Sequence, residues 1–292
     1  MQNVTMKILF SDTDRRLKQN GIMKDNHFLS QKNFQQMPLL RWLWPAKEKK
    51  SLFAEPAHPI CVIGDLHGRY DLLEIMLATI DNRDPEGSAK RIFVGDLIDR
   101  GPQSAAVLTR VHQLCASDPT RYICVMGNHE RMMLDFLGDP ERYGPRWFAA
   151  GGDQTLANFG LTLNYGTRDA QDQSRTFAEA MNAAIPVDLL AWLAALPLYW
   201  QEGSVLVSHA GADAKKAVNN QTENEMVWGN IQHKGDRKDG IWTVQGHKIV
   251  VKPAIEGRRI FTDTGAWQSG RLSAAWIDEN GLDWIKVQLG NG

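Results

Sequence analysis

The chain has 292 residues, of which 43 % are hydrophobic, and this is enough apolar material for one large domain or two small ones with a hydrophobic core. It carries 33 Lys and Arg against 34 Asp and Glu, which gives a formal net charge of −1. Because the positive and negative charges are nearly equal, electrostatics gives no reason to expect nucleic acid or an anionic membrane as the main partner. We therefore expect neither nucleic-acid binding nor membrane association.

The first 58 residues are predicted to form an N-terminal extension. They contain no continuous apolar stretch long enough for a signal peptide or a membrane span. The segment 38–45 (PLLRWLWP) is apolar but short, contains Arg41, and is followed by the charged run 47–50. Such a segment could lie on a membrane surface as an amphipathic anchor or dock on its own domain, and we favour docking.

From Pro59 onward, short apolar runs rich in β-branched residues predict buried strands. In chain order these runs are 60–63, 91–94, 122–125, 205–207 and 241–244. Between the first three runs, apolar residues recur at helical spacing over 72–80 and 107–114. Strands that alternate with helices in this way predict a layered α/β architecture.

The section 131–202 has helical character, notably over 177–181 and 187–196, and is predicted to form a helical layer or cap near a functional site. Three further strands are predicted near the C-terminus, over 259–262, 272–278 and 283–289, with a turn at 279–281. We therefore expect residues 59–292 to form one domain without a second independent one.

Three cysteines, Cys61, Cys115 and Cys124, follow no CxxC spacing. Cys61 and Cys124 lie inside apolar strand-like runs, where a free thiol behaves as a small buried hydrophobe. A sparse and odd number of cysteines without a disulfide pattern indicates a reducing compartment, so we expect a cytoplasmic protein.

A cluster of polar residues and glycines follows each of the first five predicted strands. The clusters are GDLHG (64–68), GDLIDRG (95–101), GNHE (127–130), SHAG (208–211) and GHK (246–248). Because the carboxyl ends of strands in an α/β sheet share one edge, where ligands usually bind, we expect these clusters to meet at one edge of a sheet.

GDLHG, GDLIDRG and GNHE, in this order and about 30 residues apart, resemble the signature of the phosphoprotein phosphatase family of metallophosphoesterases, which includes bacterial serine/threonine protein phosphatases. The later SHAG, GH and Asp263-Thr264-Gly265 also match in order. The resemblance covers residues 60–278 and leaves 1–58 outside. It implies a metallophosphoesterase-type β-sandwich flanked by helices, with a helical section between the third and fourth motifs.

The resemblance also implies a set of metal ligands. Carried over by position, it assigns Asp65, His67 and Asp96 to one ion, and Asp96, Asn128, His209 and His247 to a second, with Asp96 bridging. Mixed carboxylate, imidazole and amide ligands suit Mn, Fe or Zn, and we expect Mn to support activity in vitro. Two divalent ions about 3.5–4 Å apart can share a water, lower its pKa and hold the phosphoryl oxygens during in-line attack.

Three further residues receive roles from the resemblance, and Arg69 is considered because it lies just after the first cluster. His129 matches the general acid that protonates the leaving alkoxide, and Asp99 matches the residue that orients its imidazole. Arg100 would bind phosphate oxygens through its planar guanidinium, and Arg69 is a candidate second phosphate contact.

The chain departs from the family pattern at one phosphate-binding position. Relatives often place an Arg shortly after a Trp, whereas here Asn230 follows Trp228. Asn230 can donate a hydrogen bond to phosphate but cannot neutralise its charge. We consider Arg237, Lys238 or Lys248 as the compensating cation.

The resemblance implies hydrolysis of a phosphoric monoester by a metal-activated water, most often removal of phosphate from phosphoserine and phosphothreonine in proteins. Some bacterial relatives instead split dinucleoside polyphosphates, so a phosphorylated small molecule or nucleotide remains the alternative substrate. The helical section and the polar loop 212–240 would shape the substrate groove. An alternative of another class is an inactive scaffold, but the chain keeps all six ligand positions, His129 and Asp99, which favours an enzyme.

Overall fold

The computed structural model describes residues 58–161 and 170–289. The chain divides into two units, residues 1–50 and 51–292, and every described residue belongs to the second unit. The predicted extension, with its apolar segment 38–45, lies outside the described residues except for the exposed His58.

The first sheet has five strands in the order β10-β9-β1-β2-β3. Their bounds are Ile60–Ile63 for β1, Lys90–Phe93 for β2, Tyr122–Cys124 for β3, Arg271–Asp278 for β9 and Gly281–Gln288 for β10. The strands β1, β2 and β3 are parallel, and β9 runs antiparallel to both β1 and β10. The parallel strands are connected by the helices α3 (Tyr70–Arg83) and α4 (Ser104–Ser117), as the alternation of sequence periods predicts.

The second sheet also has five strands, in the order β4-β5-β6-β8-β7. Their bounds are Tyr199–Glu202 for β4, Val205–Ser208 for β5, Trp242–Gln245 for β6, Ala254–Glu256 for β7 and Arg259–Phe261 for β8. The central strands β5, β6 and β8 are parallel, and the two edge strands are antiparallel to their neighbours.

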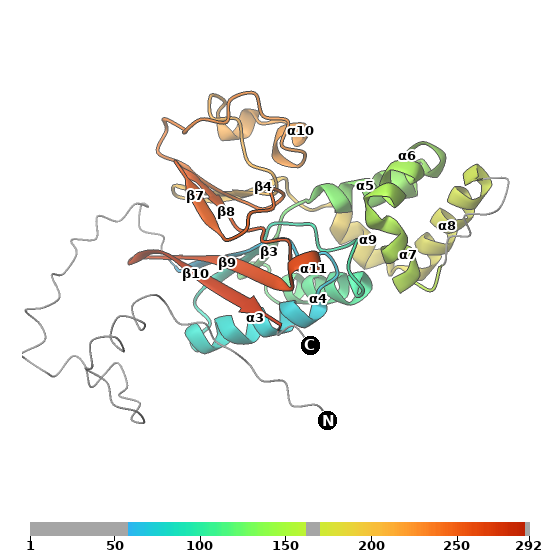
Figure 1. Ribbon diagram of the computed structural model, residues 1–292, viewed down its shortest axis with the longest axis horizontal. Helices are drawn as coiled ribbons and strands as arrows, with labels where there is room; N and C mark the ends of the chain where they lie inside the picture. Colours follow the sequence, from blue (N-terminus) through green and yellow to red (C-terminus); the bar gives the residue numbers. More distant parts are fainter. Residues whose placement is uncertain (1–57, 162–169, 290–292) are drawn as a thin grey trace, which may run out of the picture. The chain divides into compact units, whose positions relative to one another are not determined.

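The two sheets pack face to face, with helices on the outer face of the first (Figure 1). Alternation along β1 shows the layering, because Ile60 and Val62 lie in the core between the sheets while Cys61 and Ile63 lie in the core beneath the helices. The inter-sheet core consists of Ile60, Val62, Ile92, Val94, Val205, Val207, Trp242, Val244, Ile260, Ala275 and Ile277. The predicted α/β sandwich flanked by helices is thus confirmed.

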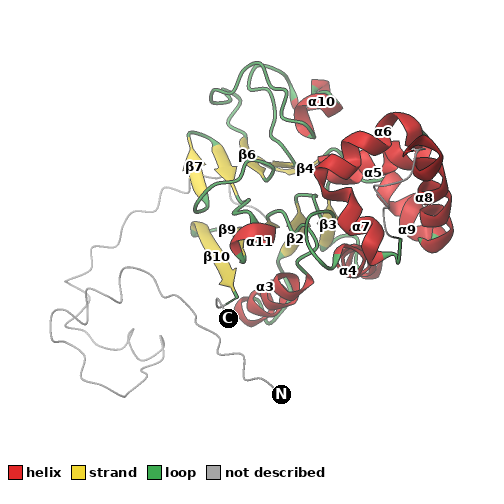
Figure 2. Cartoon of the chain, turned by 45° about the vertical axis from the view of Figure 1, so that its right-hand side comes forward, coloured by secondary structure: helices red, strands yellow, loops and turns green. Residues whose placement is uncertain are grey.

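Helices form the section between the third and fourth motifs, beside the strands (Figures 1 and 2). They are α5 (Asn128–Gly138), α6 (Pro140–Trp147), a π-helical turn (Phe148–Gly152), α7 (Asp153–Asn158), α8 (Ala170–Ala184) and α9 (Val187–Ala194). The helix α6 begins where the sequence favours it, because Pro140 occupies the first turn and the Asp139 side chain accepts a hydrogen bond from the Arg142 amide.

The expected end of the helical section at residue 202 was wrong, since β4 occupies residues 199–202. This strand forms a hairpin with β5 through Gly203, whose φ of 55° suits a tight turn. The short exposed strand β7 was also not predicted.

Loop 212–240 contains the 3₁₀ turn Val218–Asn220 and the one-turn helix α10 (Glu223–Met226), and a further short helix, α11 (Ala266–Ser269), precedes β9. By length and apolar composition, no single helix within the described part of the chain could cross a membrane, and Gln173–Ala184 with Val187–Ala194 meets that test only as a pair bent by 108°.

Candidate active site

The polar clusters meet where the carboxyl ends of the parallel strands of both sheets come together. A single sheet edge was expected, but the strands before the clusters are divided between two sheets because β5 pairs with β4 and β6 rather than with β3. Hydrogen bonds join the two edges directly. The His209 ring, after β5, donates from Nδ1 to the carbonyl of Val94, after β2, at 2.8 Å.

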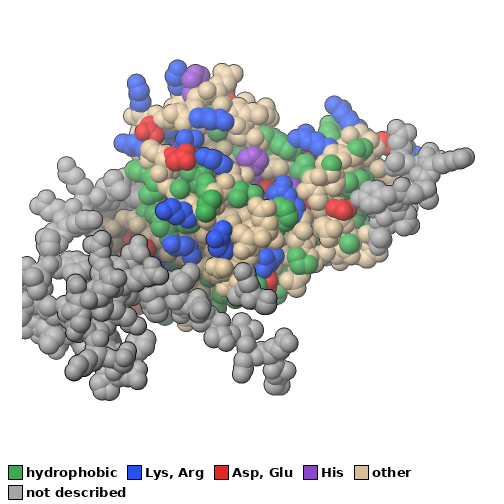
Figure 3. All heavy atoms as spheres, in the orientation of Figure 1, with side chains coloured by type: hydrophobic (Ala, Val, Ile, Leu, Met, Phe, Trp, Pro, Cys, Tyr) green, Lys and Arg blue, Asp and Glu red, His purple; other side chains and the backbone are tan. Residues whose placement is uncertain are grey.

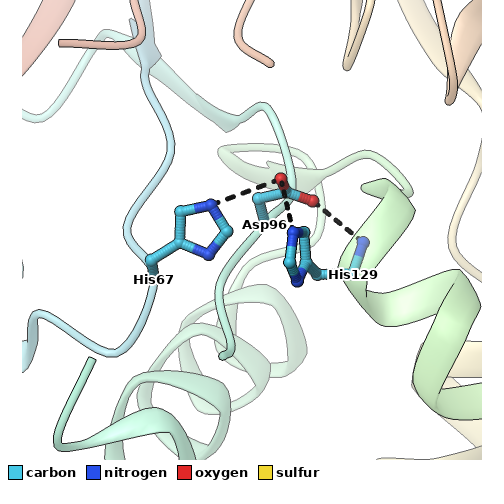
Figure 4. A group of neighbouring side chains, drawn as sticks. All are labelled: His67, Asp96 and His129. Atoms are coloured by element: carbon cyan, nitrogen blue, oxygen red, sulfur yellow. Dashed lines mark hydrogen bonds and ion pairs between the residues drawn. The ribbon is translucent and has the colours of Figure 1, made fainter. Parts of the chain in front are cut away.

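Asp96 lies at the centre of the site, with 2 % of its surface exposed. Its Oδ2 atom is 3.5 Å from Nε2 of His67, 3.9 Å from Nε2 of His129 and 3.4 Å from Nε2 of His209. The rings of His67 and His129 both point toward this carboxylate, and the His129 amide donates to Oδ1 at 3.1 Å (Figure 4). One buried carboxylate therefore faces three imidazole rings.

A second group of donor atoms lies around Asn128, His209 and His247. The Asn128 Oδ1 atom is 2.9 Å from Nε2 of His209 and 2.9 Å from Nδ1 of His247. The two ring nitrogens are themselves 3.1 Å apart. Within the part of the chain that the structure describes, two groups have ligand atoms close enough to hold a metal ion, namely His67, Asp96 and His129, and Asp96, His209 and His247.

Backbone carbonyls orient two of the rings toward the centre. His67 donates from Nδ1 to the carbonyl of Ile98 at 2.7 Å, and His209 does so to Val94. With the proton on Nδ1, the Nε2 lone pair of each ring is available to a cation, which is the arrangement that metal-binding histidines use. The donor set therefore fits a divalent metal ion.

Asp65 lies beside these groups and holds the loop that carries His247. Both of its carboxylate oxygens accept from the His247 amide, at 3.2 and 3.0 Å. A Cβ atom at Gly246 would lie 1.9 Å from the Asp65 Oδ1 atom, so only glycine fits there.

Asp96 and the imidazole rings around it shift one another's pKa values. Burial opposes ionisation of Asp96, but the surrounding His209 and His129 rings hold the pKa of this carboxyl well below its ordinary value. Burial likewise disfavours protonated His209, yet the Asp96 carboxylate raises the pKa of His209 to about 10. Burial lowers the pKa of His67 to about 3 and that of His247 to about 4. The negative field of Asp96 therefore favours a cation at the centre while two rings stay neutral.

A second chain of hydrogen bonds runs from His129 into the helical section. The Nδ1 atom of His129 is 2.6 Å from Oδ2 of Asp99. The same Asp99 oxygen accepts from the indole of Trp147 at 2.9 Å, and its other oxygen accepts from the Thr155 hydroxyl at 2.6 Å. Trp147 and Thr155 were not predicted, since neither belongs to a motif and both reach Asp99 only through the fold.

Glu130, the last residue of GNHE, was not given a role from the sequence either. It is fully buried and accepts hydrogen bonds from the amides of Asp96 and Leu97, each at 2.8 Å. Burial and the charge of Asp96 raise the pKa of Glu130 to about 7. Its place inside a motif was the signal that could have identified it.

Arg100 lies between two of the rings. Its guanidinium nitrogens lie 3.0 Å from Nε2 of His67 and 2.9 Å from Nε2 of His129. It also lies 5.6 Å from the ring centroid of Trp267. Arg100 is therefore in the same site as the candidate ligands.

Two of the other cations considered from the sequence have partners elsewhere. Arg69 binds both carboxylate oxygens of Asp71 and donates to the carbonyl of Ala266. Lys248 pairs with Glu256 at 3.2 Å.

Two further candidate phosphate-binding residues, Arg237 and Asn230, lie in loop 212–240 and also have partners there. Arg237 is buried and donates to Asp239 and to the carbonyls of Asp213 and Lys216. Asn230 is exposed, and its amide donates to the side chain of Asn224 at 2.8 Å.

The site also contains all the non-glycine residues with positive φ in the described ranges. They are His67, Asp96, Asp99, Arg100 and His247, with φ values of 44°, 51°, 73°, 66° and 61°. Backbone in this region costs free energy for residues with a side chain, and such positions concentrate at functional sites.

Comparisons with known proteins identify a family and individual relatives that the chain resembles. A family profile described as calcineurin-like phosphoesterase matches residues 58–285. The chain is 27 % identical over 240 residues to an asymmetrical bis(5'-nucleosyl)-tetraphosphatase of Geobacillus sp., covering 74 % of this chain and 89 % of the relative. It is also 27 % identical over 245 residues to serine/threonine-protein phosphatase 2 of Escherichia coli, covering 78 % of this chain and 97 % of the relative.

A solved structure shares the fold. A protein serine/threonine phosphatase from Saccharomyces cerevisiae superposes with a TM-score of 0.53 at 16 % identity, covering 81 % of this chain and 82 % of the other.

Proposed function

Because the chain belongs to the calcineurin-like phosphoesterase family and is therefore a metallophosphoesterase hydrolase, we propose that its buried site holds two divalent metal ions and hydrolyses a phosphate ester or anhydride. The observation that carries this proposal is the Asp96 carboxylate, which faces three imidazole nitrogens within 3.9 Å at the meeting point of two sheets.

The proposed ligands divide as the motif order implies. Asp65, His67 and Asp96 would hold one ion, and Asp96, Asn128, His209 and His247 the other. Bound ions would lower the pKa of a water and neutralise phosphoryl oxygens. We propose Mn as an ion that supports activity, since Mn accepts this mixture of oxygen and nitrogen donors.

Two further residues are proposed to act on the substrate directly, namely His129 and Arg100. We propose that His129 donates the proton of its Nε2 atom to the leaving oxygen while Asp99 holds Nδ1. Arg100, whose guanidinium already reaches the space between His67 and His129, would bind the phosphoryl oxygens. Arg69 and Asn230 remain weaker candidates for phosphate contacts, since their side chains are engaged by Asp71 and Asn224.

Two substrates are supported by different relatives. Phosphoserine and phosphothreonine in proteins are supported by the similarity to serine/threonine-protein phosphatase 2, which extends over 97 % of that relative. Dinucleoside polyphosphates are supported by the similarity to the bis(5'-nucleosyl)-tetraphosphatase, over 89 % of that relative.

The test is hydrolysis of p-nitrophenyl phosphate, a phosphothreonine peptide and diadenosine tetraphosphate, with Mn²⁺ added and then chelated. Metal-dependent release from at least one substrate is the expected result. Folded protein that binds two ions but hydrolyses none of the three would instead support the scaffold alternative.

A further inference from the structure

Arg146, at the end of α6, stacks on the indole ring of Trp228, which follows α10. The guanidinium carbon is 4.1 Å from the ring centroid, the shortest such distance between a cation and an aromatic ring in the described part of the chain. Arg146 is exposed and Trp228 is half-buried. A guanidinium that lies over an aromatic ring still has N–H groups available for other partners.

The residue that follows each member of this pair lies against a residue of the site. On the helical side, Trp147, the neighbour of Arg146, donates its indole hydrogen to Asp99. On the other side, a Cβ atom at Gly229, the neighbour of Trp228, would lie 3.6 Å from the His247 ring. The chain neighbours of the pair, Trp147 and Gly229, therefore reach the proposed general acid's partner and a proposed metal ligand.

Among residues 58–161 and 170–289, the Arg146 side chain contacts the Trp228 ring, and no ion pair with a carboxylate is found for it. By contrast, Arg69 and Arg237 are each bound to a carboxylate. The helical section therefore presents an oriented, unneutralised cation, although the sequence had suggested a compensating cation from loop 212–240 or from Lys248.

We propose that Arg146, held by Trp228, binds a second phosphate group of the substrate, beyond the one that is attacked. This inference rests on the proposed function and deepens it, because it selects a substrate with a phosphate chain, such as a nucleoside polyphosphate, over a single phosphate ester. The face drawn in Figure 3 carries many Lys and Arg side chains and fewer Asp and Glu, which suits a polyanionic substrate.

The test compares Arg146→Gln with Arg142→Gln as the matched control. Arg142 lies on the same helix, is exposed, and also stacks on a ring, that of Tyr143 at 5.0 Å. The kcat/KM of each variant is measured for diadenosine tetraphosphate and for p-nitrophenyl phosphate, with Mn²⁺ in excess. We expect Arg146→Gln to lower the value about tenfold or more for the tetraphosphate, with little change for the monoester, because it removes one charge-assisted contact. Arg142→Gln should leave both values unchanged.

A second pair of variants checks that Trp228 orients the cation. Trp228→Phe should keep most of the preference for the tetraphosphate, and Trp228→Leu should reduce it as Arg146→Gln does. Equal effects of Arg146→Gln on both substrates would overturn the inference and leave the proposed function standing, as would a selective loss on an acidic phosphothreonine peptide instead of the tetraphosphate. An inactive wild-type protein with bound Mn²⁺ would overturn the proposed function and this inference with it.

Discussion

The imidazole of His129 donates from Nδ1 to the carboxylate of Asp99 across 2.6 Å, and both side chains are almost completely buried. This bond fixes one tautomer and one ring orientation, with Nε2 directed to the guanidinium of Arg100. Burial lowers the pKa of His129, but the carboxylates of Asp96 and Asp99 outweigh it and raise the pKa above its ordinary value. A ring held in this way suits proton donation near neutral pH.

Asp99→Asn should reduce kcat by roughly 10² or more for an alkyl phosphate, and less for p-nitrophenyl phosphate, whose leaving group needs no proton. The substitution removes a charge that raises the pKa of His129. Because the acid form exists below that pKa and is lost as pH rises through it, the alkaline limb of the pH–rate profile should move to lower pH.

The control for this prediction is Asp135→Asn on the same helix as His129, which removes only the ion pair with Arg131. Its pH–rate profile should match that of the wild type. An alkaline limb that stays in place in Asp99→Asn would show that His129 is not the titrating acid.

Asp96→Asn should abolish measurable hydrolysis and lower the metal content, since the amide cannot supply the charge shared by three imidazole rings. Bound metal is measured by mass spectrometry after gel filtration, beside turnover. Asp283→Asn, which removes an exposed partner of Arg83, is the control. Retained turnover in Asp96→Asn would contradict the two-metal proposal.

Glu130→Gln should lower the free energy of unfolding by about 1–3 kcal/mol, because glutamine has one acceptor oxygen where Glu130 uses two for the amides of Asp96 and Leu97. One buried amide would lose its partner. Urea denaturation measures the change, with the exposed Glu86→Gln as control. An unchanged midpoint would mean that the Asp96 turn is held by other contacts.

Trp147→Phe should cost about 2–4 kcal/mol of folding stability, since it removes both a buried donor to Asp99 and part of a fully buried ring. It should also lower kcat, because Asp99 loses one of the groups that orient it. Thermal unfolding and turnover are measured beside Trp192→Phe, where the ring is only half-buried. A stability loss without any change in kcat would confine Trp147 to a packing role.

The sequence predicted the parts of the site that lie in short motifs after strands. Asp96, His67, Asn128, His209 and His247 come together as the motif order implies, because each follows the carboxyl end of a parallel strand. The apolar runs and the helical spacing also predicted the central strands, α3 and α4, with predicted ends that differ from the observed ends by at most a few residues.

The rest depended on the path of the chain in space. Trp147 and Thr155 lie 48 and 56 residues from Asp99 along the chain, and no local sequence pattern predicts a contact over that separation. The assignment of strands to two sheets was likewise hidden, because buried strands of both sheets have the same apolar composition. Short edge strands such as β7 carry too few residues for a period to be read.

The left-handed backbone at five site residues also limits which sequences this fold can tolerate there. Valine, isoleucine and threonine are especially disfavoured in that conformation, while glycine, asparagine and aspartate enter it at lower cost. A saturation library selected only for folded, soluble protein should therefore already be depleted of β-branched residues at His67, Asp96, Asp99, Arg100 and His247. The backbone geometry of the site would then restrict the residue types at these positions independently of any selection for catalysis.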